Sequence, residues 1–539
     1  MRARTVWGRG AAALCAAALV MAGCSNDDRS DRVDTAATTT VPGPTARPMD
    51  PAAEATLASA VGDGSCDELD TARCLLPFPS DRFTVTDADT DTGRRVHLPT
   101  GQLANVSGST LDVTEWNRND GFSPGSPVLV SAPGADLAAS GAPPIGDIGA
   151  SMQPDSATAL VDLTTGKRLA HWAEMDAHVP ADQGILILRP AAALPEGHRI
   201  GVAVGRLVDG AGAALTPSPA FVAYRDRLTT GIDAVEERRP AMEEVFGAAA
   251  AVGMDRADLY AAWSFTVASQ RDLSERLLTM RDDAFERIGP GAPTFTVERV
   301  VTDGLPTGIG RRVIGTFSVP SYLTGDGGPG SRLTTGTGGG LPSYAGTDLE
   351  ANFTCQIPAA ALAGPGGTTR PVVYGHGLLG AADEAQNSQV AKIASTNDMV
   401  YCATDWIGMS ETDIGNAATI LKDASSFNTL ADRSQQGILN TIFLGRLLVT
   451  EDGFVSDPAF QNAGGDPLVD TSHLFYDGNS QGGVIGGAFV ATSPDVEAGV
   501  LGVAGMNYST LLERSVDFDP FNDLFTVTCP DPVDRVVGL

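Results

Sequence analysis

Short apolar segments alternate with helix-like stripes of apolar residues in the second half of this 539-residue chain. The segments have the length of buried strands, and the stripes recur with the spacing of an amphipathic helix. Strands and helices that alternate at this length predict an α/β fold with a mostly parallel sheet. The predicted strands cover 313–319, 351–357, 370–375, 399–405, 472–477 and 499–503, with helices near 382–395 and 430–448.

The first half of the chain has a different pattern. Residues 61–230 contain short strand-like runs separated by turns, such as 159–163 and 168–172 around a Thr-Thr-Gly-Lys turn. This spacing is typical of hairpins and predicts a β-rich, sandwich-like accessory domain. Residues 231–290 predict a helical connector, with one helix starting at Pro240 and another capped by Ser269.

A tight turn joins the strand 472–477 to the helical segment after it. Its sequence is Gly478-Asn479-Ser480-Gln481-Gly482. A strand, a tight turn and a helix form the context that a G-x-S-x-G nucleophile elbow requires. Glycines at 478 and 482 permit the strained turn that exposes the serine hydroxyl. We therefore predict that Ser480 is a nucleophile; the alternative is a small residue in a glycine-rich turn.

A second match to the same motif lacks this context. Gly121-Phe122-Ser123-Pro124-Gly125 follows a polar segment. Pro124 also has no backbone N–H to donate to an oxyanion. Ser123 is therefore predicted to be a turn residue.

A strand that ends in a His-Gly pair lies about a hundred residues before Ser480. A loop in this position supplies one oxyanion N–H, and the residue after the nucleophile supplies the other. The predicted donors are the amides of Leu378 and Gln481. His376 and Gly377 are predicted to shape the loop, and His376 is not expected to be the base, which normally comes late in the chain.

The two motifs resemble the α/β-hydrolase fold over residues 370–510, most specifically at 371–380 and 474–487. With its export signal and β-rich N-terminal region, the chain resembles bacterial extracellular virulence-factor lipases, which have their own N-terminal domain. The resemblance implies an α/β-hydrolase domain over 291–539 and serine ester hydrolysis. It implies no metal and no organic cofactor.

The resemblance also implies an acid and a histidine base after the nucleophile, yet no histidine follows Ser480. His473 precedes Ser480 by seven residues. A strand of that length spans about 20 Å, which places His473 at the opposite end of the sheet from Ser480. The sequence predicts one strand after the elbow. The resemblance implies two further strands, which would carry the acid and the base. We therefore expect that the chain lacks the C-terminal part of its hydrolase domain. Weak candidates for the acid are Asp517, Asp519 and Asp523.

The first 24 residues predict an export signal. Three arginines precede an apolar stretch, 11–22, and Met21-Ala22-Gly23-Cys24 resembles a bacterial lipobox with Cys24 as the lipidated residue. The stretch is shorter than the roughly 20 residues that span a membrane; the alternative is an ordinary secretory signal. Residues 25–60 contain few large apolar residues and predict a disordered tether. We expect an exported cell-envelope lipoprotein that is anchored to a membrane by lipid.

The net charge excludes some classes of partner, and the cysteines indicate candidate disulfides. A formal net charge of −30 argues against binding to nucleic acid or to an anionic membrane surface. Cys66 and Cys74 are close in sequence and are the best candidates for a disulfide in an exported protein. Cys355 and Cys402 either form a second bridge or stay as buried thiols.

The favoured hypothesis is a serine carboxylic-ester hydrolase of the lipase or esterase type, outside the cell, that acts on a lipid or a small ester. The alternative is a surface lipoprotein that uses an inactive hydrolase domain as a binding module.

Overall fold

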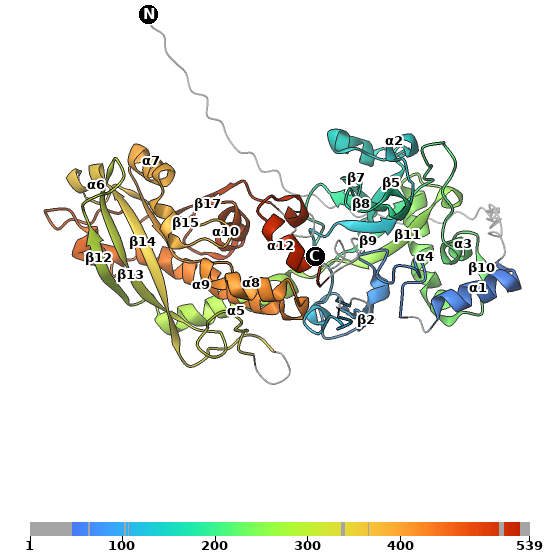
Figure 1. The fold of residues 1–539 in the computed structure, drawn as a ribbon, viewed down its shortest axis with the longest axis horizontal. Coiled ribbons are helices and arrows are strands. Elements are labelled where there is room, and N and C mark those ends of the chain that lie inside the picture. The colour runs from blue at the N-terminus through green and yellow to red at the C-terminus, as the bar shows by residue number, and fades with distance from the viewer. Residues whose placement is uncertain are drawn as a thin grey trace, which may run out of the picture. The chain divides into compact units, whose positions relative to one another are not determined.

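The computed structural model describes residues 46–528 except 63–64, 102–103, 106, 336–339, 365 and 506–510, and only the backbone of residue 513. The predicted lipobox, with Cys24, and the tether up to residue 45 lie outside the described residues. The two largest sheets come from different halves of the chain (Figure 1).

A seven-stranded sheet in the order β12-β13-β14-β16-β15-β17-β18 forms the centre of the second half. The neighbours among β16, β15, β17 and β18 run parallel, whereas β12, β13 and β14 pair antiparallel. The sheet is therefore less parallel than predicted, because no helix crosses between β13 and β14 among the described residues. The strands are β12 (Phe295–Val301), β13 (Ile309–Pro320), β14 (Asp348–Pro358), β15 (Arg370–Gly375), β16 (Met399–Ala403), β17 (Phe475–Asn479) and β18 (Ala498–Gly502).

Helices cover both faces of this sheet. α7 (Ser388–Asn397) packs on one face, and α5 (Gln270–Ile288), α9 (Asn428–Val449) and α10 (Gln481–Thr492) pack on the other (Figure 1). Val372 and Val373 of β15 enter these two cores in turn, as the two-residue period of a strand requires. The structure is thus an α/β protein in this half of the chain.

The first half contains two antiparallel sheets that share one core. A four-stranded sheet has the order β11-β9-β5-β6 and a three-stranded sheet the order β4-β8-β7. Val128 and Val130 of β4 face the shared core, whereas Leu129 enters a separate cluster on the outer face. The strands are β4 (Val128–Ser131), β5 (Thr158–Asp162), β6 (Lys167–Leu169), β7 (His171–Met175), β8 (Ile185–Pro190), β9 (Arg199–Val204) and β11 (Ala261–Thr266).

Two segments differ from their predictions. The predicted connector contains α4 (Asp233–Ala251), which begins before Pro240, and then β11, which pairs with β9. Apolar burial of 261–266 in the accessory sheet overrides the helical reading of this segment. Residues 51–60 of the predicted tether belong instead to α1 (Pro51–Val61), because the Asp50 carboxylate caps its first amides and two apolar residues of the helix are buried.

Short elements complete the fold, and two disulfides join parts of it. Cys66 pairs with Cys74, and Cys355 of β14 pairs with Cys402, directly opposite on β16. None of the described helices has the length and apolarity needed to cross a membrane. Besides 3-10 turns, the short elements are β1 (Arg47–Pro48), β2 (Thr84–Thr86), β3 (Arg94–Val96), β10 (Leu228–Thr229), α2 (Leu137–Ser140), α3 (Pro219–Arg225), α6 (Ala359–Ala363), α8 (Ile414–Ile420) and α12 (Asp519–Phe525).

Candidate active site

Ser480 lies at the junction of β17 and α10, and its backbone is strained. Its φ of 56° and ψ of −118° fall in a region that side-chain-bearing residues rarely adopt. The Ser480 amide donates to the carbonyl of Gly502 at 3.0 Å, and the Ser480 carbonyl accepts from the Val484 amide at 3.1 Å. Strand β18 and helix α10 therefore hold the strained turn from both sides.

The glycines on either side of Ser480 are required by close backbone approaches. A Cβ atom on Gly482 would overlap the carbonyl oxygen of Gly375, and one on Gly478 would overlap the Gly482 carbonyl. The hydroxyl of buried Tyr476 donates to that same Gly482 carbonyl at 2.5 Å. These contacts fit the start of α10 tightly against the end of β15.

The loop with the predicted oxyanion amide leaves the same edge of the sheet as Ser480. Gly375, the last residue of β15, is the register partner of Gly478 on the parallel strand β17. Loop 376–380 therefore begins beside the turn that carries Ser480. Leu379 has a φ of 48°, and the Leu378 amide donates no hydrogen bond to another described residue. Gln481 is the first residue of α10, where helix amides carry partial positive charge.

His376 is fully buried and holds this loop in place. Its Nδ1–H donates to the Gly377 carbonyl at 2.9 Å, and its Nε2 accepts the Trp406 amide at 2.8 Å. Because Nε2 accepts the Trp406 amide, the ring is neutral with its proton on Nδ1, and burial also lowers the pKa of His376. The Gly377 amide donates to the Glu384 carboxylate at 2.8 Å. Both ring nitrogens of His376 are thus engaged by backbone groups, one in the loop and one at Trp406 after β16, and neither hydrogen-bonds Ser480.

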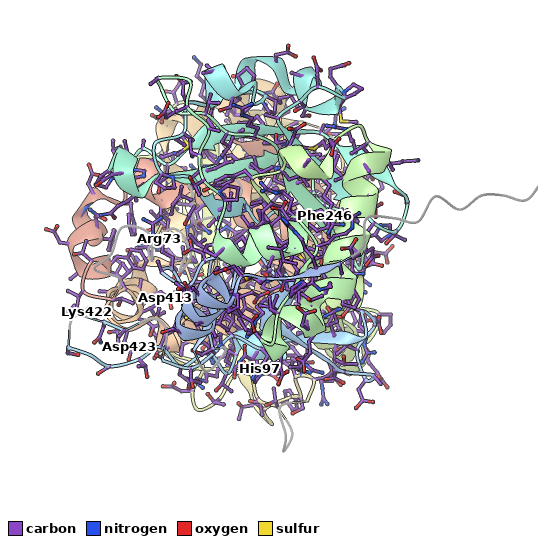
Figure 2. All side chains as sticks on the ribbon, turned by 90° about the vertical axis from the view of Figure 1, so that its right-hand side faces the viewer. Arg73, His97, Phe246, Asp413, Lys422 and Asp423 are labelled. Carbon is purple, nitrogen blue, oxygen red and sulfur yellow. A yellow bond between two sulfur atoms is a disulfide. The ribbon has the colours of Figure 1, made fainter. Side chains whose placement is uncertain are left out.

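The other histidines also lie away from Ser480. His473 lies two residues before β17, beyond the end of the strand opposite Ser480, and its Nδ1 contacts Glu497 at 2.7 Å. His97 is exposed (Figure 2). None of the six histidines, all of them described, hydrogen-bonds Ser480. The remaining three bond Thr158 and Leu169 (His171), Asp176 (His178) and Asp162 (His198).

Neither Ser123 nor the three candidate aspartates have an arrangement suited to catalysis. Ser123 is exposed in a turn, where its hydroxyl accepts the Gly125 amide at 3.2 Å. Asp517, Asp519 and Asp523 are exposed in and near α12, and none of them contacts a histidine.

An apolar cavity of about 250 Å³ borders loop 376–380. Sequence reasoning missed it, because its walls come from segments far apart in the chain. A signal was present in the spacing of Phe518, Phe521 and Phe525, which is that of one helix face. The lining residues are Trp116, Leu378, Leu379, Met409, Ala417, Ile420, Leu421, Ala424, Phe427, Leu430, Leu512, Phe518, Phe521 and Phe525.

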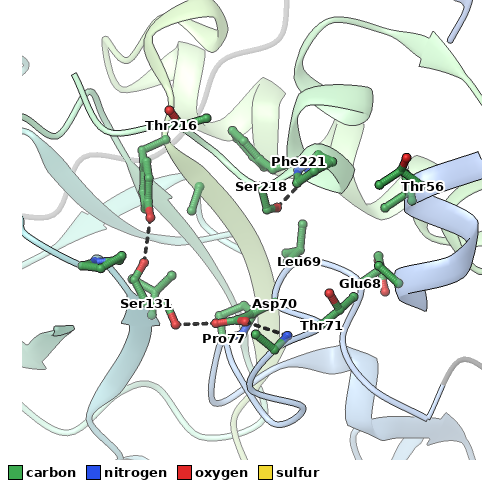
Figure 3. A pocket seen from close by; sticks show the side chains of 18 residues that line it. Thr56, Glu68, Leu69, Asp70, Thr71, Pro77, Ser131, Thr216, Ser218 and Phe221 are labelled. Atoms are coloured by element: carbon green, nitrogen blue, oxygen red, sulfur yellow. Dashed lines mark hydrogen bonds between the residues drawn. The ribbon is translucent and has the colours of Figure 1, made fainter. Parts of the chain in front are cut away.

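A second cavity, of about 270 Å³, lies among the N-terminal elements (Figure 3). The Ser131 hydroxyl donates to the Asp70 carboxylate, and the Tyr260 hydroxyl donates to the Ser131 carbonyl at 2.9 Å. Burial raises the pKa of Asp70. These polar groups satisfy one another, and we assign this cavity no role. In the described part of the chain, no group of three or more His, Cys, Asp or Glu side chains is placed to hold a metal ion.

No known protein family matches the sequence, and no curated protein matches it either. Among solved structures, acetyl xylan esterase 1 from Thermoanaerobacterium sp. JW/SL YS485 is 15% identical over 49% of this chain and 68% of its own, with a TM-score of 0.28. An acetyl xylan esterase from Paenibacillus sp. R4 is 15% identical over 49% of this chain and 72% of its own, with a TM-score of 0.29. The rice cell wall degrading esterase LipA from Xanthomonas oryzae is 15% identical over 41% of this chain and 45% of its own, with a TM-score of 0.17. These similarities are distant and cover at most about half of the chain.

Proposed function

We propose that this protein is a serine carboxylic-ester hydrolase of the α/β-hydrolase type, with Ser480 as its nucleophile. The observation that carries the proposal is the positive φ of Ser480 at a strand-to-helix junction, between two glycines that no larger residue can replace. Strain of this kind persists only where the surrounding structure enforces it, and it is concentrated at functional sites. A nucleophile elbow has this strand–turn–helix geometry.

The proposed reaction has two stages. The Ser480 Oγ attacks the ester carbonyl carbon, and the amides of Leu378 and Gln481 donate to the resulting oxyanion. Collapse of the tetrahedral intermediate releases the alcohol and leaves an acyl group on Ser480. Water then attacks the acyl-enzyme and releases the carboxylic acid. The proton from Ser480 passes to a base and then to the departing alkoxide.

We infer that this base is none of the six histidines, because none of them hydrogen-bonds Ser480. His376 has both nitrogens engaged, and His473 lies at the other end of β17. The proposal therefore includes a base and its orienting acid from residues other than the six histidines. Activity assays should use the protein as its own cells produce it.

The test is hydrolysis of p-nitrophenyl butyrate by that protein and two variants. Ser480→Ala should lower kcat/KM at least about a thousandfold, because without the nucleophile only binding and the oxyanion donors contribute. The matched control, Ser123→Ala, should retain the wild-type rate. A Ser480→Ala protein that hydrolyses the ester at the wild-type rate would refute the assignment.

The alternative is an inactive hydrolase-type domain that serves as a binding module on the cell surface. The absence of a histidine at Ser480 among the described residues favours it. Such a module would bind an ester without cleaving it, so both serine variants would match the wild type in the same assay.

We also propose that the protein is exported and tethered through lipid on Cys24. The Cys66–Cys74 and Cys355–Cys402 disulfides support an oxidising compartment outside the cytosol. A fatty-acid analogue fed to cells should label the wild type and not Cys24→Ala. If both proteins are released unlabelled into the medium, the anchor is wrong.

A further inference from the structure

We propose that the apolar cavity beside loop 376–380 binds the acyl chain of the ester, and that Trp116, from the N-terminal half, sets the length of chain it accepts. This inference rests on the proposed function and names its substrate class, which is esters of aliphatic acids of medium chain length. It also gives the N-terminal half of the chain a direct part in specificity.

The cavity is placed to receive the acyl group. Leu378 supplies the proposed oxyanion amide and also lines the cavity, as does Leu379. A carbonyl oxygen held by the Leu378 amide therefore lies next to the wall of the cavity that Leu378 forms. The rest of the acyl group extends from that carbonyl carbon, so the adjacent cavity is the space available to it.

The chemistry of the walls selects an alkyl chain. All of the lining residues are apolar, and the set includes the rings of Phe427 and Phe518. A sugar or a charged group would lose its hydrogen bonds to water here without replacement, which is costly. An acetyl group would leave most of the space empty. About 250 Å³ is below the roughly 300–1,000 Å³ of pockets for drug-sized ligands, which favours medium chains over long ones.

Trp116 closes one wall of the cavity and is held in place. Its ring stacks on Phe427 with 6.3 Å between centroids and 28° between planes. Nearby, the Asp112 amide donates to the Ser425 hydroxyl at 3.0 Å. The Glu115 carboxylate lies 3.8 Å from Arg276 on α5. Contacts on both sides of Trp116 therefore fix its indole against the cavity, so the indole limits the space for the chain.

The size of the effect follows from burial. Each buried methylene contributes about 0.8 kcal/mol, which is about a fourfold gain in kcat/KM. For the wild type, kcat/KM should rise by this factor per methylene until the cavity is full, and then fall. Truncation of the indole should admit further methylenes and move the optimum to longer chains.

The experiment measures kcat/KM for p-nitrophenyl acetate, butyrate, octanoate, dodecanoate and palmitate with the protein from its own cells. Trp116→Ala should raise the ratio of dodecanoate to octanoate hydrolysis about tenfold or more, since it admits two or more methylenes. The control is Trp172→Ala, at a half-buried tryptophan on β7 that does not line the cavity, and it should leave the ratio unchanged.

A second pair of variants fills the cavity. Ala417 on α8 lines it, whereas the next residue, Ala418, does not. Ala417→Trp should lower the ratio of octanoate-ester to acetate-ester hydrolysis at least about tenfold, since the buried chain is lost. It should also weaken binding of octanoate, measured by calorimetry, by a similar factor. Ala418→Trp is the control, with no change in either measurement.

Each result decides between the two proposals. Unchanged chain-length preference in Trp116→Ala and Ala417→Trp, with ester hydrolysis intact, would overturn the acyl cavity and leave the proposed function standing. If octanoate binds and Ala417→Trp blocks it, while no ester is hydrolysed, the cavity is supported and the proposed function fails. Octanoate that binds neither the wild type nor any variant would overturn the cavity.

Discussion

Replacement of His376 by alanine should destabilise the protein and displace the loop that carries Leu378. The imidazole is fully buried and bridges two backbone groups, the Gly377 carbonyl and the Trp406 amide. Alanine can replace neither hydrogen bond. The two backbone groups would then lack a partner at a position that water does not reach.

The cost has three parts. A buried amide without an acceptor costs about 1–3 kcal/mol, and the orphaned carbonyl adds a smaller amount of the same kind. Removal of a fully buried ring leaves a cavity whose walls lose their contacts. Together these effects should lower the free energy of unfolding by about 4 kcal/mol. Loop 376–380 should also move, which would remove one oxyanion donor and lower kcat about a hundredfold or more.

The assay is urea unfolding followed by circular dichroism, with His473→Ala as the matched control. His473 is exposed and its partner Glu497 is exposed too, so its loss should cost no more than about 1 kcal/mol. If His376→Ala unfolds at the same urea concentration as His473→Ala, the loop-holding role is refuted. A variant that is fully stable and yet inactive would instead point to His376 as the base.

Three further predictions concern other parts of the fold. Burial lowers the pKa of His171 to about 4, so on acidification the unfolded state binds a proton at this residue before the folded state does. The free energy of unfolding should therefore fall by about 2 kcal/mol between pH 7 and pH 5, and by less in His171→Gln, as urea unfolding at both pH values would show. Removal of the Cys355–Cys402 bridge, which spans 47 residues, should cost about 4 kcal/mol in the same assay; an unchanged midpoint would argue against a formed bridge. Gly482→Ala should abolish ester hydrolysis, because its Cβ would overlap the backbone of β15, while Gly487→Ala on the same helix, where a Cβ meets only an ordinary contact at 3.7 Å, should keep it.

The sequence was most informative where the signal is local. The elbow could be predicted because Gly478, Ser480 and Gly482 lie within five residues, between a strand and a helix. The hairpin of β5 and β6 is confirmed, with Asp162 opposite Lys167, and the Ser269 cap of α5 is confirmed as well. Short-range backbone geometry sets each of these features, so a single segment is enough to indicate it.

The sequence was least informative where tertiary contacts decide. The strand β12 was missed because it is an edge strand with several exposed residues, which weakens its apolar pattern. The strand β11 was assigned to a helical connector, although it pairs with β9. The acyl cavity could not be predicted, since Trp116, Leu378 and Phe518 meet only after the chain has folded. A residue pattern does not encode such long-range meetings directly.

The central claim is that Ser480 is an activated nucleophile, and covalent labelling tests it most directly. The protein purified from its own cells should be incubated with a fluorophosphonate probe, digested and analysed by mass spectrometry. The account predicts one probe per chain on the peptide that contains Ser480, with no labelling of Ser480→Ala and unchanged labelling of Ser123→Ala. Labelling that survives in Ser480→Ala, or none in the wild type, would contradict it.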